Sequence, residues 1–353
     1  MKPSICFVTA PLIARSGVYN STVELVQAAR AAGLDWTAVI GTSRRAAGEP
    51  ADLSGVYEFE AEPAGTRGVL RLSRYLRALP QVRDADLRIS MVPQSDMALS
   101  LLGRPWVAYL RGLPWPAQGE ASPAKRLVWQ TLEKLSLARA EEIWATTSIL
   151  EQDVGGIVDR RVPPGLKPPS TNRDIPAGRT AFVWAARYSI DKNPSLFFDA
   201  LRGSTATGLM YGSGPLESEL RASAPANVKV PGWRPRDEIW TRARAYVGTS
   251  SREAFGRSAT EAAMLGIPVI ISEEFGCADM LYTEPWMREL CVLPVGRPEA
   301  WRAAVTALAH DDALHASISA HVADNASRLT IDAAVFNVAT AATAAVQSLS
   351  RPR

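Results

Sequence analysis

The feature that most constrains the fold of this chain is a regular alternation of short apolar segments with longer amphipathic segments. In the first half, the apolar segments predict strands at 4–10, 36–42, 56–60, 87–92, 106–110 and 142–147. The segments between them have helical spacing and predict helices at 22–32, 67–79, 96–102, 125–139 and 149–158. Strands that alternate with helices form a parallel sheet with covered faces. An α/β fold is therefore predicted.

The Pro-rich stretch 162–169 interrupts this alternation, and a second series follows it. Strands are expected there at 180–186, 208–211, 228–230, 245–248 and 268–272, and helices at 194–201, 216–222, 237–244, 253–265 (with its approach loop), 297–310 and 313–326. We expect two Rossmann-like domains, 1–167 and 168–330. The Ala-rich segment 331–353 remains, and its helix is expected to cross back onto the first domain.

Composition and charge exclude several classes of protein. Hydrophobic residues make up 47% of the 353 residues and charged residues 21%, which is typical of a folded globular protein. The net charge of +3 is dispersed, without the basic patch and interleaved aromatics that would indicate a nucleic-acid partner. The chain has no apolar stretch of roughly 18 residues, and its N-terminal apolar run is too short for a signal peptide. Together with three scattered cysteines that suggest neither disulfides nor zinc, this favours the cytoplasm.

Three segments that follow expected strands carry candidate ligand-binding residues. Arg187 and Lys192 could grip a diphosphate, although isolated loop cations are more often simply solvated. Gly212 and Gly214 would let the backbone approach a ligand, or they could form a plain turn. Trp233, which follows Gly232, could lie near a flat base or could be an ordinary packed or surface residue.

The run from Glu253 to Glu261 is the most specific segment. Phe255 and Gly256 would expose backbone N–H groups at the mouth of a helix, where anions bind. The carboxylate of Glu261 could chelate two vicinal hydroxyls, such as those of a ribose. Glu253 could instead complement the helix dipole and Glu261 could face solvent. The small apolar run that follows Glu261 argues against a solvent position.

These segments, in this order, resemble the retaining GT-B glycosyltransferases of the family 4 type, also called glycosyl transferases group 1. The family signature is two glutamates separated by seven residues and followed by a small-residue helix and Gly-x-Pro-Val, here Gly266-Ile267-Pro268-Val269. The resemblance implies two domains facing across a cleft. It also implies transfer of a sugar, with retention, from a UDP- or GDP-linked donor to a hydroxyl acceptor in glycan, glycolipid or glycoconjugate biosynthesis.

The resemblance also implies residue roles. Arg187 and Lys192 would neutralise the donor diphosphate, Glu253 would contact the transferred sugar, and Glu261 would hold the ribose. The other residues expected to bind the donor are Gly17, Gly212, Gly214, Gly232, Trp233, Phe255, Gly256 and Ser258. The sequence shows no DxD-type metal motif, so neither a metal nor a cofactor is expected.

The first half departs from the family pattern on the acceptor side. Arg111 stands where many relatives have a His, and an arginine cannot act as a base. It could orient an anionic acceptor or be a surface residue, and Asp96 is a spare candidate base. The chain's histidines all lie at 310–321, which disfavours a His-based inverting mechanism.

The acceptor is expected to be a saccharide or a lipid-linked hydroxyl compound. The segment 67–77 has basic and apolar faces, so it could rest on anionic lipid, or it could pack on the sheet with its arginines in water. Two other functions stay open. One is a nucleotide-sugar epimerase or phosphorylase of the same architecture, and the other is a non-catalytic nucleotide-sugar-binding protein.

Overall fold

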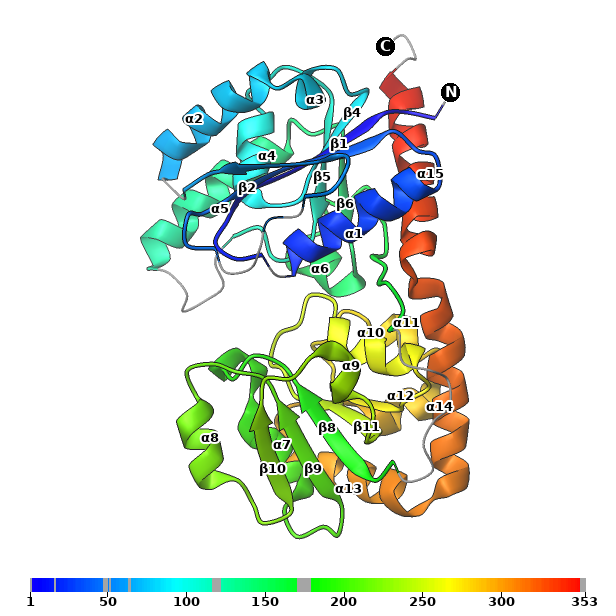
Figure 1. The fold of residues 1–353 in the computed structure, drawn as a ribbon. Coiled ribbons are helices and arrows are strands. Elements are labelled where there is room, and N and C mark those ends of the chain that lie inside the picture. Colours follow the sequence, from blue (N-terminus) through cyan, green and yellow to red (C-terminus); the bar gives the residue numbers. More distant parts are fainter. Residues whose placement is uncertain are drawn as a thin grey trace. The chain divides into compact units, whose positions relative to one another are not determined.

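The structure is a computed structural model that describes residues 2–15, 17–46, 50, 52–62, 65–115, 122–169 and 179–349. The chain forms two compact units (Figure 1). Unit 1 comprises residues 1–166 together with 331–353, and unit 2 comprises residues 167–330. Within the described residues each unit contains one parallel sheet with helices on its faces, so the predicted α/β class and the two Rossmann-like folds are confirmed.

The sheet of unit 1 has the strand order β3-β2-β1-β4-β5-β6-β7. Its strands are β1 (Ile5–Leu12), β2 (Trp36–Thr42), β3 (Val56–Glu60), β4 (Leu87–Ser90), β5 (Trp106–Leu110), β6 (Glu142–Ala145) and β7 (Arg160–Arg161). The central strands are almost wholly buried because helices cover both faces. The strand order reverses between β1 and β4, and in such sheets ligands bind beyond the carboxyl ends of the strands at this point.

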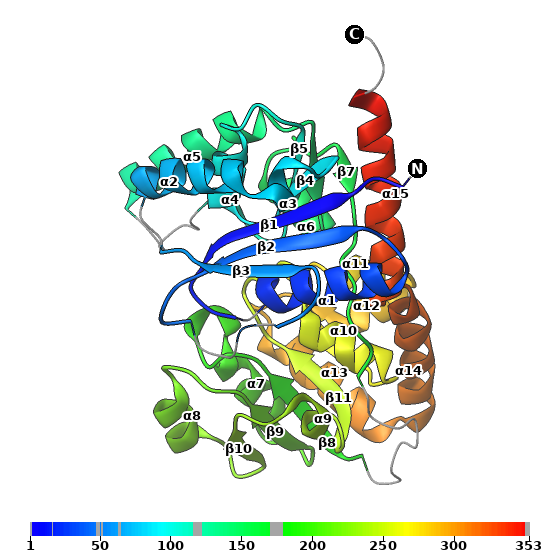
Figure 2. The same ribbon diagram turned by 45° about the horizontal axis from the view of Figure 1, so that its top comes forward.

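Two layers of helices enclose this sheet. On one face, α1 (Val18–Ala31) packs with α15 (Ile331–Leu349) in a core that includes Phe7, Trp36 and Val338. On the other face, α2 (Gly65–Ala78), α4 (Pro93–Leu99) and α5 (Pro123–Leu137) share a second core around Val8 and Trp106 (Figure 2). The short helices α3 (Pro80–Arg83) and α6 (Ser148–Asp153) complete the unit.

Unit 2 has the strand order β10-β9-β8-β11-β12-β13. Its strands are β8 (Ala181–Ala185), β9 (Thr207–Tyr211), β10 (Val228–Gly232), β11 (Ala243–Gly248), β12 (Val269–Ser272) and β13 (Val292–Leu293). Its helices are α7 (Pro194–Leu201), α8 (Glu217–Ser223), α9 (Arg236–Ile239), α10 (Arg257–Met264), α11 (Ala278–Leu281), α12 (Pro285–Cys291), α13 (Pro298–His310) and α14 (Asp312–Ala326), with 3-10 turns at Ile190–Lys192 and Ser327–Leu329. The order reverses between β8 and β11.

Two predicted helices of unit 2 differ from the structure by more than one residue at an end. The helix expected over 237–244 ends at Ile239, because the residues from Ala243 onward form the buried strand β11 between β8 and β12. The helix expected with its approach loop from Glu253 begins only at Arg257, after Gly256 with a positive φ of 104°.

Among the described residues, no helix combines the length and the apolar character needed to cross a membrane.

Candidate functional site

The loops that follow β8, β9, β10 and β11 lie at one edge of the unit 2 sheet, because the strands are parallel. A pocket of ≈480 Å³ opens at this edge. Among its lining residues are five of the predicted donor-binding residues, namely Arg187, Gly212, Gly214, Trp233 and Ser258. Tyr211, Ser213, Arg234 and Ile239 also line it, and they were not among the predicted site residues.

Gly212 and Gly214 let two of these loops touch. Gly212 has φ 148°, and a Cβ atom there would lie 1.9 Å from the carbonyl oxygen of Ala186. A Cβ on Gly214 would lie 2.5 Å from the carbonyl oxygen of Tyr188. The Tyr188 N–H donates to the Ser213 carbonyl at 2.9 Å. The sequence predicted that the backbone at these glycines could approach another group closely. In this structure that group is the protein's own backbone, and the contact shapes the pocket wall.

Lys192 and Glu253 follow β8 and β11 and form an ion pair at the same edge of the sheet. Lys192 Nζ lies 2.8 Å from Glu253 Oε2 and 3.7 Å from Asp191 Oδ2, although Lys192 and Glu253 are 61 residues apart. Both side chains of the pair are partly exposed, so the pair contributes at most about 1 kcal/mol to stability. Its main effect is on geometry, because Glu253 fixes the position of the Lys192 cation at the end of β8.

The start of α10 brings the next group of predicted residues together. Phe255 is buried, and a Cβ on Gly256 would lie 2.6 Å from the Phe275 ring. Ser258 in the first turn reaches the pocket. The first backbone N–H groups of a helix have no intrahelical acceptor and favour anions.

Glu261 is buried on α10 and has a partner that the sequence did not indicate. Its Oε2 atom lies 3.0 Å from Nε of Arg236, and the same guanidinium donates to the Lys167 carbonyl at 2.9 Å. The prediction that Glu261 does not face solvent agrees with its exposure of 8%. No spacing rule pointed to Arg236, because it precedes Glu261 by 25 residues in a different element.

Gly232 and Trp233 differ in their surroundings. Gly232 ends β10 with φ 86°, and its carbonyl accepts from the Gly212 N–H at 3.1 Å. Trp233 is 66% exposed and lines the pocket, so an indole face is available to a ligand. Trp233 is therefore not packed in the core, and its contact with a flat base stays a prediction.

Unit 1 brings Asp96 and Arg111 to one small pocket. This cavity of ≈150 Å³ lies at the carboxyl ends of β4 and β5. The Arg111 guanidinium donates to the Ser21 hydroxyl and lies 5.0 Å from the centre of the Tyr109 ring. Arg111 is therefore held in place at the pocket wall.

The Asp96 carboxyl faces Glu133 of α5 inside the protein. Burial raises the pKa of Asp96 to about 6, and burial together with the nearby Asp96 charge raises the pKa of Glu133 to about 12. Asp96 Oδ1 and both Glu133 carboxyl oxygens are shielded from solvent and have no hydrogen-bond partner of standard geometry in the described structure. Asp96 lines the small pocket but is only 2% exposed, and its role as a base stays a prediction.

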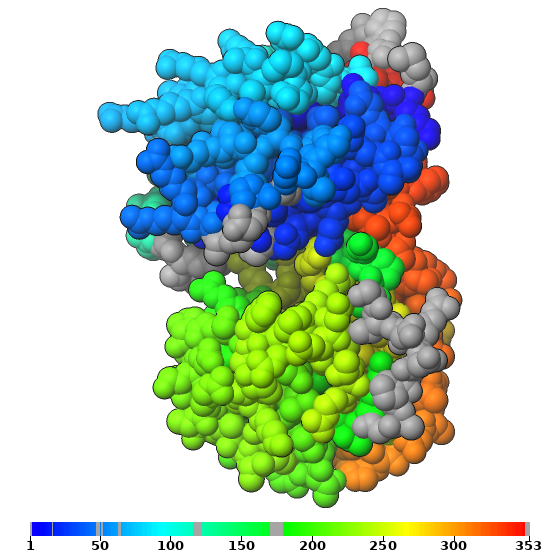
Figure 3. All heavy atoms as spheres, in the orientation of Figure 1, coloured from blue at the N-terminus to red at the C-terminus, as the bar shows by residue number. Residues whose placement is uncertain are grey.

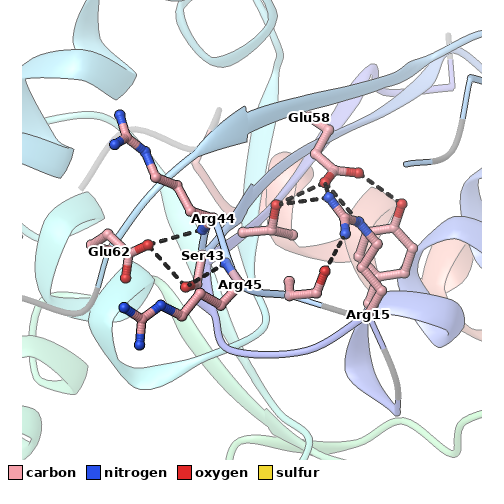
Figure 4. A network of polar contacts seen from close by, with 9 residues as sticks. Arg15, Ser43, Arg44, Arg45, Glu58 and Glu62 are labelled. Atoms are coloured by element: carbon pink, nitrogen blue, oxygen red, sulfur yellow. Dashed lines mark hydrogen bonds and ion pairs between the residues drawn. The ribbon is translucent and has the colours of Figure 1, made fainter. Parts of the chain in front are cut away.

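The segments that follow β1, β2 and β3 are tied together by a polar network (Figure 4). Glu58 accepts from Arg15 Nε at 2.9 Å, from Tyr19 at 2.8 Å and from Thr42 at 2.7 Å. These hydrogen bonds outweigh the effect of burial and lower the pKa of Glu58. Glu62 accepts from the Ser43 hydroxyl and the Arg44 N–H, each at 2.9 Å. The Arg15 charge is thus neutralised within unit 1.

Gly17 precedes α1 with φ 43°, and its carbonyl accepts from the Ser21 N–H at 3.0 Å. Gly17 lies in unit 1, and its part in donor binding stays a prediction. In the part of the chain that is described, no group of three or more His, Cys, Asp or Glu residues could hold a metal ion.

Residues 171–325 match the family model described as glycosyl transferases group 1. This segment contains the pocket of unit 2 and the ion pairs of Lys192 and Glu261. No curated protein matches the chain in sequence.

Solved structures show the same fold over nearly the whole chain. Sucrose-phosphate synthase from Thermosynechococcus elongatus is 17% identical, with a TM-score of 0.79, and the similarity covers 98% of this chain and 100% of that one. Anabaena Alr3699/HepE, in complex with UDP and glucose, is 16% identical, with a TM-score of 0.72 and coverage of 97% and 100%. The lipopolysaccharide outer core galactosyltransferase WaaB, in its apo form, is 14% identical, with a TM-score of 0.73 and coverage of 97% and 99%. The fold is GT-B, and the family match in unit 2 supports glycosyl transfer from a nucleotide sugar.

Proposed function

We propose that this chain is a retaining hexosyltransferase of the family 4 type that transfers a sugar from a UDP- or GDP-linked donor to a hydroxyl acceptor in glycan, glycolipid or glycoconjugate biosynthesis. The observation that carries the proposal is the pocket of unit 2, where Arg187, Trp233 and Ser258 meet within the segment that matches the glycosyl transferases group 1 model. The HepE structure, with its UDP and glucose, supports a uridine diphosphate donor.

The cations of the site would stabilise the leaving diphosphate. Negative charge grows on this group as the glycosidic bond breaks, and preorganised positive groups lower the barrier most where water is excluded. Arg187 lines the pocket, and Glu253 fixes Lys192 at the same edge of the sheet. The N-terminus of α10, at Gly256, adds backbone N–H groups. This arrangement supplies charge stabilisation from the protein alone, so the reaction would need no metal.

Two further contacts would orient the donor. Trp233 offers an exposed ring for a flat base, and Glu261, held by Arg236, offers a carboxylate for the ribose hydroxyls. The carboxylate of Glu253 would contact the transferred sugar while it keeps Lys192 in position. The anomeric configuration would be retained if the acceptor hydroxyl attacked on the face that the phosphate leaves. The departing phosphate oxygen would then accept the proton of that hydroxyl.

The acceptor, a saccharide or a lipid-linked alcohol, would bind in unit 1. A pocket of ≈500 Å³ there is lined by Phe59, Tyr75 and Gln94, among others, which is a mixture of aromatic and polar groups suited to a sugar. Arg111 in the smaller pocket would orient an anionic acceptor group. A reducing cytoplasm suits the three buried free thiols of Cys6, Cys277 and Cys291.

The test combines ligand binding with turnover. UDP and GDP are added to the full-length protein, and the one that belongs to the donor is expected to raise the melting temperature by mass action. Lys192→Ala and Glu261→Ala are each expected to lower sugar transfer or donor hydrolysis by about 10²- to 10³-fold, since each removes a preorganised contact. Lys229→Ala and Glu299→Ala change the same residue types at exposed positions outside the pocket and should retain full turnover. Wild-type turnover in the Lys192 and Glu261 variants would refute the donor-site assignment.

A further inference from the structure

The ion pair of Arg236 and Glu261 lies next to the wall of the unit 2 pocket. Ser258 on α10 lines the pocket, and Glu261 is three residues further along the same helix. Residues three apart share a face of an α-helix, so Glu261 lies on the face that carries Ser258. Ile239 on α9 also lines the pocket, and Arg236 precedes it by three residues. The ion pair therefore joins two helices that each supply one residue to the pocket wall.

Arg236 is the inward cation of a short surface helix. Its neighbours Asp237 and Glu238 are exposed, whereas the Arg236 side chain is only 32% exposed. Figure 3 shows the outer side of α9 (yellow-green) on the surface of unit 2. The buried Trp240 follows α9 and packs edge-on against the ring of Tyr246 on β11, with the ring centres 5.8 Å apart. This contact fixes the end of α9 on the sheet.

The Arg236 guanidinium links Glu261 to a restricted part of the backbone. One nitrogen donates to the Lys167 carbonyl at 2.9 Å, and Nε lies 3.0 Å from Glu261 Oε2. This Nε is shielded from solvent and makes no hydrogen bond of standard geometry in the described structure, so opposite charge holds it to Glu261. Lys167 precedes Pro168, which limits the conformations of its backbone. The rigid plane of the guanidinium therefore connects a fixed carbonyl with the carboxylate.

The position and the charge of Glu261 both matter for a ribose. An ionised carboxylate only accepts hydrogen bonds, and two vicinal hydroxyls can donate to its two oxygens if these are correctly placed. The Glu261 side chain is 11% exposed, so without Arg236 its charge would be buried and uncompensated. Arg236 thus favours the ionised form and limits the directions in which the carboxylate can turn.

We propose that Arg236 is a positioning residue that gives the donor site its preference for a ribonucleotide over a 2′-deoxyribonucleotide. The inference rests on the proposed function, because it takes Glu261 as the group that holds the ribose. A 2′-deoxyribose lacks one of the two hydroxyls and gives the carboxylate one hydrogen bond fewer. Sugar donors built on deoxythymidine diphosphate should therefore bind weakly, and donors built on a ribonucleoside diphosphate should bind well.

A purely structural ion pair would have a different effect. If Arg236 only stabilised unit 2, its loss would weaken the binding of ribonucleotides and deoxyribonucleotides by the same factor. The ratio of the two dissociation constants cancels such general changes. This ratio therefore separates a positioning role from a structural one.

The experiment is isothermal titration calorimetry of the full-length protein with UDP, 2′-deoxy-UDP, GDP and 2′-deoxy-GDP. The wild type should bind the ribose form of its nucleotide about tenfold more tightly, because the lost hydrogen bond is to a charged group. Glu261→Ala should bring the ratio close to one. Arg236→Ala should do the same by weakening the ribonucleotide and leaving the deoxyribonucleotide nearly unchanged. Arg236→Lys keeps a cation without the planar fork and should recover part of the preference.

Arg244→Ala is the matched control. The Arg244 guanidinium also connects a carboxylate with a backbone carbonyl, since it lies 2.6 Å from Asp312 Oδ1 and 2.7 Å from the Leu308 carbonyl. Arg244 stands at the beginning of β11, whereas the pocket lies beyond the carboxyl ends of the strands. This variant removes the same kind of link far from the predicted ribose contact, and it should keep the wild-type ratio.

The outcomes separate this inference from the proposed function. The role of Arg236 is overturned if Arg236→Ala keeps the wild-type ratio, or if it weakens both forms of the nucleotide equally. It is also overturned if the wild type binds both forms with the same affinity. A wild-type protein that binds none of the four nucleotides would refute the proposed function, and the inference with it. A clear wild-type preference that Glu261→Ala leaves unchanged would refute the assignment of Glu261 to the ribose.

Discussion

At the scale of single residues, the carboxyl pair of Asp96 and Glu133 makes the stability of unit 1 depend on pH. The folded protein holds the Glu133 proton up to a pKa of about 12, whereas an unfolded glutamate releases it near its ordinary value of about 4.3. Between these two values the folded state binds more protons, so the free energy of unfolding falls as pH rises. The pair stabilises the fold most at acidic pH.

Glu133→Gln should remove most of this pH dependence. The amide is neutral at every pH and has a similar shape, so in the variant only the titration of the buried Asp96 still lowers stability as pH rises. We expect its melting temperature to exceed that of the wild type by a few degrees at pH 9 and by less at pH 5. Thermal unfolding at both pH values measures this, with the exposed Glu299→Gln as a control that should follow the wild type. Equal slopes in all three proteins would show that the pair does not titrate as described.

Individual contacts of the site could not be predicted from the sequence. The motif order pointed to Lys192, Glu253 and Glu261, but which residues pair with them depends on how distant loops meet. The ion pair of Lys192 with Glu253 spans 61 residues, and that of Glu261 with Arg236 joins two helices. No periodicity carries this information. The same holds for Glu133, whose place on an amphipathic helix gave no sign that it faces Asp96.

At the scale of elements, the contact between the loops after β8 and β9 depends on Gly212. An added Cβ would lie 1.9 Å from the Ala186 carbonyl oxygen, and the backbone cannot move away without breaking the Ala186 and Tyr211 ladder bond. Gly212→Ala is expected to destabilise unit 2 by about 2–3 kcal/mol and to deform the pocket. Gly296→Ala is the control, because no heavy atom lies within 4 Å of its added Cβ. Equal unfolding midpoints in urea for the two variants would contradict this account.

Elements were predictable where pattern and packing agree. Buried inner strands such as 36–42 and 106–110 were predicted with their observed bounds, because runs of apolar and β-branched residues permit few alternatives. The helix expected at 237–244 was wrong beyond Ile239. Its residues fit a helix locally, but pairing with β8 and β12 on both sides favours a strand. Tertiary contacts decide such cases, and local sequence does not contain them.

At the scale of the whole molecule, unit 1 depends on a helix that arrives from the far end of the chain. The residues of α15 that face α1 and the sheet include Val335, Val338 and Ala342, and all are buried in the core of unit 1. The Ile331 N–H donates to the Leu166 carbonyl at 2.8 Å, so the chain re-enters unit 1 beside the point where it left.

A chain that ends at Thr330 should therefore lose folded unit 1 and keep folded unit 2. Removal of α15 exposes one side of a core, which is among the most destabilising changes a domain can undergo. Calorimetry should show loss of one unfolding transition and persistence of the other. A chain that ends at Leu349, and so lacks only residues 350–353, serves as the control and should unfold like the full-length protein. Two retained transitions in the shorter chain would show that α15 is dispensable.

The return of α15 also sets the order of events on the ribosome. Domains usually fold as units, those nearer the N-terminus first. Here unit 2 is continuous in sequence and has all its residues once 330 has been made, whereas the core of unit 1 stays open on one side until α15 emerges. The half of the chain that is synthesised first is therefore completed last, and until then its unfinished core is a surface to which chaperones could bind.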